Sequence, residues 1–264
     1  MVAGLLLVGF ILGPALCQEW RELRGDHFII FYRSDERFAA EVARRAELYY
    51  TQIASDLGYA RYSNFWQWEK RVKIYIYPAQ AEFLAESGQP EWSHGMASYT
   101  KKAIYTYISH ERFLESLLPH EITHLIFRDF VGLHGTIPLW LDEGVAQWEE
   151  PDKRAIAKQA ARYLIETGKW IPLADLTSID IRDSSDAERV QAFYMQAVSL
   201  VDYLIRAYGP SEFTEFCREL RDGKPLEAAL RAAYTNSIDS LPELEAKLKR
   251  YVQEKDSFPP IFPR

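Results

Sequence analysis

The chain of 264 residues has short strand-like segments in its first part and helical spacing in its second part. Residues 71–77 alternate strictly between apolar and polar positions, as a half-buried strand does, and residues 26–32 are typical of another strand. Residues 95–100 and 103–108 predict two more strands, joined by a turn at Lys101-Lys102, where Gly or Asn is the usual choice. We therefore predict three to five strands in one sheet.

Helical spacing begins with residues 35–57, in which apolar side chains recur at three- and four-residue steps until Gly58. A short helix is predicted around Phe83. Past residue 150 the pattern is entirely helical, and Ser240 with Glu243 forms a capping box at the start of the last helix. The predicted C-terminal helices cover residues 153–167, 186–208, 211–221, 225–234 and 241–254.

Composition allows a large packed core, because 48% of the residues are hydrophobic and 14% are aromatic. The net charge is −7, and no dense Lys/Arg stretch is present. Nucleic-acid binding normally needs a clustered positive surface, so this class of partner is disfavoured.

An uncharged apolar run at residues 2–16 predicts a secretory signal, with Ala15 and Cys17 at the −3 and −1 positions of a cut before Gln18. The expected location is secreted or periplasmic. The alternative is an uncleaved membrane anchor, although the run is shorter than the ~20 residues of a spanning helix. Cleavage would leave only Cys217, so no internal disulfide is expected.

The candidate chemistry lies in His120-Glu121-Ile122-Thr123-His124. Residues four apart on a helix share one face, about 6 Å apart along the axis, so His120 and His124 can aim at one point. Glu121 lies about 100° around the same helix, where it could take a proton from a metal-bound water. We expect this helix to begin near Ser116 as its N-cap, with Pro119 in the first turn.

Glu143 is the predicted third ligand, and eighteen residues separate it from the second histidine. It lies in a second predicted helix that has Pro138 in its first turn. Gly144 is unfavourable within a helix by about 1 kcal/mol, which predicts a close approach of two helix backbones. Asp142 is a weaker rival because adjacent helical residues point about 100° apart, and His134 could reach only if its loop folded back.

This pattern, His-Glu-x-x-His with a later Glu in Trp-Leu-x-Glu-Gly, resembles the gluzincin metallopeptidases, particularly the aminopeptidase-N type. Bacterial peptidase MA-like domains are closer in size. The close resemblance covers roughly residues 117–150, with looser similarity from about 26 to 210. It implies that Glu121 is the general base and that one zinc ion is bound by three residues: His120, His124 and Glu143.

Family members carry a Tyr at a comparable place after the zinc-binding Glu, so the resemblance makes Tyr194 the candidate donor to the oxyanion. The alternative interpretation of Tyr194 is a core tyrosine on an amphipathic helix, and Tyr203 and Tyr208 are the fallback donors. Gln147 or Asp129 could orient the histidines from outside the ligand set.

The predicted fold class is α+β, with a small mixed or antiparallel sheet and the zincin helix followed by an all-helical half. In this division, residues 1–17 form the signal peptide, 18–150 an α/β zincin subdomain and 151–264 a helical subdomain. A cleft between the halves would hold a peptide or protein substrate.

The predicted function is exported zinc metallopeptidase, in which Glu121 activates a zinc-bound water. An extended peptide would add to a sheet edge at Gly95–Ser98. Aminopeptidases of the resembling type carry Gly-x-Met-Glu-Asn there, and no Glu follows Met96, so endopeptidase action is favoured. The alternatives are a non-catalytic metal-binding or scaffolding module of the same fold, and a metal-dependent hydrolase of a non-peptide substrate.

Overall fold

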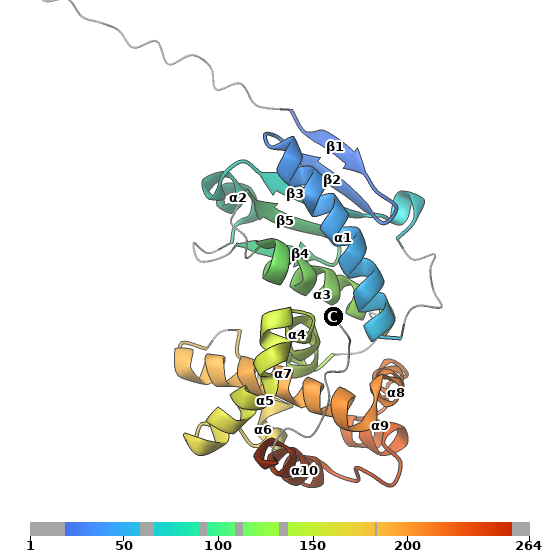
Figure 1. Ribbon diagram of the computed structural model, residues 1–264, viewed down its shortest axis with the longest axis vertical. Coiled ribbons are helices and arrows are strands. Elements are labelled where there is room, and N and C mark those ends of the chain that lie inside the picture. The colour runs from blue at the N-terminus through green and yellow to red at the C-terminus, as the bar shows by residue number, and fades with distance from the viewer. Residues whose placement is uncertain are drawn as a thin grey trace, which may run out of the picture.

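The computed structural model describes residues 19–58, 66–89, 94–108, 113–131, 137–182 and 184–254. The predicted signal at 1–17 lies outside these residues, as does His134. Figure 1 shows the sheet and its helices at one end of the molecule and the C-terminal helices at the other. The fold class is α+β, as the sequence predicts.

The sheet is mixed and has the strand order β1-β2-β3-β5-β4. Strands β2 (Phe28–Tyr32), β3 (Val72–Tyr77) and β5 (Ala103–Tyr107) are parallel to one another. Both edges are antiparallel, with β1 (Arg21–Arg24) on β2 and β4 (Gly95–Ser98) on β5. The predicted β4–β5 hairpin is therefore confirmed, and β4 forms an edge of the sheet.

In the β4–β5 turn, a lysine occupies the position at which Gly or Asn is usually found. Lys102 adopts a positive φ of 46°, the left-handed conformation that those residues usually supply. Its ammonium group donates to Asp129 Oδ2 at 2.8 Å, which ties the turn to helix α3 (Leu118–Val131).

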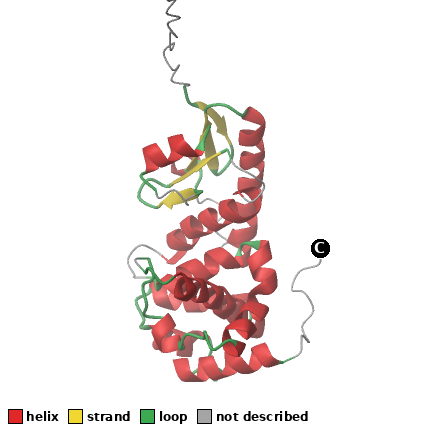
Figure 2. Cartoon of the chain, turned by 90° about the vertical axis from the view of Figure 1, so that its left-hand side faces the viewer, coloured by secondary structure: helices red, strands yellow, loops and turns green. Residues whose placement is uncertain are grey.

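Helices lie on both faces of the sheet (Figure 2). Helix α1 (Glu36–Asp56) packs on β2 and α3, and buries the apolar stripe predicted from its spacing. Helix α2 (Gln80–Ser87) packs on β3 and β5, with Phe83 fully buried. These contacts fix α3, the helix that carries the two histidines, against β4 and α1.

The C-terminal helices follow the predicted pattern closely. They are α4 (Leu139–Trp148), α5 (Pro151–Glu166), α6 (Leu173–Leu176), α7 (Ala187–Tyr208), α8 (Pro210–Arg221), α9 (Leu226–Ala233) and α10 (Leu241–Gln253). The short α6 was not predicted. Ser240 accepts from the Glu243 amide, as its predicted cap requires, and the Glu243 carboxylate accepts from the Asp239 amide.

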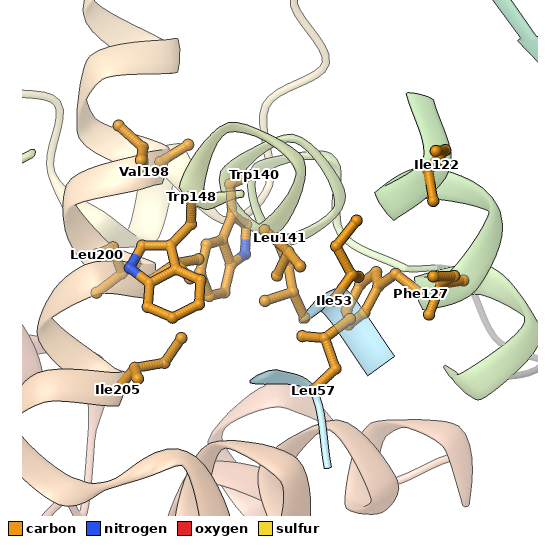
Figure 3. Close-up of a cluster of buried hydrophobic side chains, with 14 of the residues drawn as sticks. Ile53, Leu57, Ile122, Phe127, Trp140, Leu141, Trp148, Val198, Leu200 and Ile205 are labelled. Carbon is orange, nitrogen blue, oxygen red and sulfur yellow. The ribbon is translucent and has the colours of Figure 1, made fainter. Parts of the chain in front are cut away.

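Helix α4 lies between α3 and α7, and its side chains join one continuous core (Figure 3). A Cβ on Gly144 would lie 2.7 Å from the Ala197 carbonyl oxygen of α7. Only glycine permits this approach, so the predicted contact of two helix backbones is confirmed. The helix bearing Glu143 is thereby held against α7.

The expected N-cap at Ser116 is wrong. Residues Phe113–Leu117 form a π-helical turn that runs directly into α3, so Ser116 lies inside helical structure. Its hydroxyl donates to Glu150 instead. Pro119 does fall in the first turn of α3. Within the described ranges, no helix has both the length and the apolar character needed to cross a bilayer.

Candidate metal centre

Three side chains from helices α3 and α4 converge on one point. His120 Nε2 and His124 Nε2 are 3.1 Å apart, and they lie 3.7 and 3.9 Å from Glu143 Oε2. All three donor atoms lie within 4.8 Å of one another. Two nitrogens held at 2.0–2.1 Å from a tetrahedral zinc ion would be separated by roughly 3.4 Å, so these imidazoles fit one ion.

The other ring nitrogens fix the tautomers of both histidines. His120 Nδ1 donates to Glu150 Oε1 at 2.9 Å, and His124 Nδ1 donates to Asp142 Oδ1 at 3.1 Å. A neutral imidazole carries one proton, so both Nε2 atoms would then present lone pairs to each other. Such lone pairs repel unless positive charge lies at this point, as a proton on His124 or as a metal ion.

Asp142 and Glu150 are themselves held by cations. Arg128 Nη2 donates to Asp142 Oδ2 at 2.6 Å, and Lys153 Nζ donates to Glu150 Oε1 at 2.8 Å. Burial tends to raise the pKa of each carboxyl, but His124 and Arg128 lower that of Asp142 below its usual value. His120 and Lys153 do the same for Glu150. Both groups are therefore anionic acceptors at neutral pH, as the outer partners of metal-binding histidines commonly are.

The orienting residues predicted from the sequence are wrong. Asp129 accepts from Trp66 Nε1 at 2.6 Å and from the Lys102 ammonium, so its carboxylate is engaged by other donors. Gln147 lines the wall of the adjacent cavity. Asp142 and Glu150 take this role. The only sequence signal for Glu150 is its position two helical turns after Glu143.

Carboxylates around His124 favour a cation at its position. Burial lowers the pKa of His124, but Asp142, Glu143 and Glu121 outweigh it and raise the pKa to about 9. The same three negative charges would stabilise a divalent ion, and binding of that ion would release the imidazole proton. Donor atoms, spacing and charge thus all fit a zinc ion.

Glu121 lies beside this cluster but outside the ligand group. Its side chain is buried, with the residue 8% exposed, and burial raises its pKa while His120 and His124 oppose the rise. The backbone of Ala97 on β4 hydrogen-bonds to it, which lowers the pKa and connects the carboxylate to the sheet edge. A carboxylate with a raised pKa is a better proton acceptor than an exposed one.

Tyr194 of α7 faces the same cavity as His120 and Glu143. Burial, together with the negative charge of Glu143, raises its pKa to about 12, so it stays a hydroxyl donor at neutral pH. The fallback donors Tyr203 and Tyr208 are not among the described residues that line this cavity, and their hydroxyl groups bond to each other at 3.1 Å.

Tyr99 is a site residue that sequence reasoning did not select. Its ring meets that of His124 edge-on, with centroids 6.4 Å apart, and the Arg128 guanidinium lies 4.0 Å from the Tyr99 centroid. Tyr99 follows β4 directly, so the hairpin places it over the second histidine. Tyr99 therefore packs against Arg128, whose guanidinium holds Asp142, the carboxylate that orients His124.

The family model of the Peptidase MA superfamily matches residues 62–253. This span includes the histidine helix, the Glu143 helix and nearly all of the helical half, so the chain belongs to the Peptidase MA superfamily. The resemblance drawn from the motif is therefore confirmed, and the protein is peptidase-like in fold. A search of curated proteins finds no match.

Proposed function

We propose that this protein is an exported zinc endopeptidase. The observation that carries the proposal is the pair of imidazoles whose Nδ1 atoms are both engaged by carboxylates, with the Nε2 atoms turned toward each other and toward Glu143. A bound zinc ion would polarise the scissile carbonyl and lower the pKa of a water from 15.7 to about 7.

Glu121 would act as the proton carrier. It would accept a proton from the attacking water and deliver it to the leaving amine. Burial supports this role because it raises the proton affinity of the carboxylate. Asp142 and Glu150 would keep the imidazoles oriented throughout, since each is fixed by a cation of its own.

The edge strand β4 supports peptide binding. Its backbone reaches Glu121 through Ala97, so a peptide added to this edge would run past the base. The residues after Met96 are Ala97 and Ser98, which offer no carboxylate to hold a substrate amine. We therefore assign cleavage within chains rather than at their amino ends.

Metal analysis and digestion of a peptide library together test this function. We expect about one zinc per chain and internal cleavage products, with cleavage lost on chelation and restored by zinc. Acetylation of the peptide amino ends should leave cleavage unchanged. Bound zinc with no cleavage of any peptide would favour a non-catalytic module, and turnover restricted to other esters or amides would favour a non-peptide hydrolase.

Tyr194→Phe tests the oxyanion donor. The variant keeps the ring and its edge-to-face contact with Phe193 but removes the hydroxyl. We expect kcat to fall by about 10²-fold with KM nearly unchanged, because the hydroxyl would act on the transition state. Tyr163→Phe, at an exposed tyrosine of α5, is the matched control. An unchanged kcat in Tyr194→Phe would make Tyr194 a packing residue.

A further inference from the structure

A cavity of about 550 Å³ opens from the metal cluster and runs between α5 and α7. His120 and Glu143 are among its lining residues, so a group bound in it lies close to the metal cluster. Its two walls are single helix faces at three- and four-residue steps. They comprise Lys153, Ile156 and Ala160 from α5, and Gln191, Tyr194, Met195 and Val198 from α7, and Gln147 of α4 lines the cavity as well.

The walls of this α5–α7 pocket are mainly apolar. Ile156 is 52% exposed, although it is a large aliphatic side chain. Because it lines the pocket, its exposed surface is available to contact a bound apolar group. Lys153, the one Lys or Arg among the lining residues that the structure describes, already binds Glu150. A charged side chain entering the pocket would therefore lose hydration, while the described charged groups beside it are already engaged, Lys153 with Glu150 and Glu143 with the histidines.

We propose that the α5–α7 pocket binds a large apolar side chain, from a residue that flanks the scissile bond, and that Ala160 sets how large it can be. The inference rests on the proposed peptidase function and adds the substrate class. The volume lies within the range of small-ligand pockets, which allows an aromatic side chain and adjoining backbone. Ala160 is 7% exposed, so its methyl group forms part of the wall rather than of the outer surface.

Ala160→Leu tests the size limit, because it adds three carbons to the wall. We expect kcat/KM for a substrate with Phe at the preferred flanking position to fall about 10- to 100-fold, with little change for its Ala counterpart. Ala155→Leu adds the same atoms at an exposed position of α5, outside the pocket, and should change neither value. Equal losses for Phe and Ala substrates in Ala160→Leu would overturn the size limit.

Ile156→Glu tests the apolar character at a position whose exposure makes folding tolerant of the change. The variant should lower kcat/KM for Phe substrates about 10-fold and reduce the preference for Phe over Ala. A preference that survives in Ile156→Glu would overturn the assignment of this pocket.

Calorimetry with two dipeptide hydroxamates, one with a Phe and one with an Ala side chain, separates this inference from the peptidase function. The hydroxamate binds the metal and needs no hydrolysis, so the difference in affinity reports the pocket. We expect the Phe compound to bind the zinc-loaded parent at least 10-fold more tightly, and Ala160→Leu to remove that difference. Equal binding of both compounds would overturn the pocket assignment, whereas binding of neither would overturn the metal site on which it rests.

Discussion

Replacing Glu121 with Gln is expected to leave zinc in place and to lower kcat for peptide hydrolysis by about 10²- to 10⁴-fold. The amide has nearly the shape of the carboxylate but cannot accept the proton of the attacking water. Zinc should be retained because Glu121 lies outside the group formed by the two histidines and Glu143. Elemental analysis and single-turnover kinetics on the same preparation measure both effects.

Two controls make the Glu121→Gln result specific. Glu115→Gln makes the same change at an exposed position in the turn before α3 and should keep full activity. His124→Ala should lose zinc, since it removes one of the converging nitrogens. Hydrolysis by Glu121→Gln at the parental rate would exclude Glu121 as the base, and zinc retained in His124→Ala would require a different ligand set.

Glu149→Gln is expected to make the protein more stable at alkaline pH, by a few kcal/mol. Glu149 is 1% exposed, and among the residues that the structure describes neither of its carboxylate oxygens has a hydrogen-bond partner, while the Arg154 guanidinium lies 3.9 Å away. Burial, with Asp56 nearby, raises its pKa to about 8 from 4.5. The protonated Glu149 therefore contributes to the free energy of unfolding. This contribution is fully present below pH 4.5 and is lost as the pH rises through about 8.

Denaturant unfolding at pH 5 and pH 9 measures this effect. The free energy of unfolding of the parent should fall by roughly 1.4 kcal/mol per pH unit where the pH lies between the unfolded-state and folded-state pKa values of Glu149. The Gln variant has no proton to lose, so its curve should be flatter. Glu166→Gln, at an exposed site on α5, is the control and should follow the parent. Parallel pH dependences for parent and Glu149→Gln would show that Glu149 ionises normally.

The elements that the sequence predicted well are those with a strong internal period. Helix α1, strand β3 and the C-terminal helices each bury one face, so their spacing reveals them. His120 and His124 were found in the same way, because helical spacing alone puts them together, whereas Glu143 was selected from the helix predicted around it and from the family resemblance. Gly144 also predicted its contact with a second helix, because glycine within a helix is unfavourable unless a close approach requires it.

The elements that the sequence missed depend on partners far along the chain. Strand β1 has the sequence Arg-Glu-Leu-Arg, and only its pairing with β2 makes it a strand. Ser116 has the chemistry of an N-cap, but Glu150, 34 residues away, takes its hydroxyl. Glu150 was also not predicted as the partner of His120, which lies 30 residues away. A charged residue near the end of a helix is usually interpreted as solvent-exposed.

Helix α4 supplies three consecutive residues with separate duties. Asp142 orients an imidazole of α3, Glu143 completes the donor group, and Gly144 abuts the backbone of α7. The position of Glu143 relative to the histidines therefore depends on the packing of α4 against both α3 and α7. The α5–α7 pocket shares helix α7, so a pocket occupant that moved α7 would change the affinity for the ion, and the ion would then change the affinity for that occupant by the same factor.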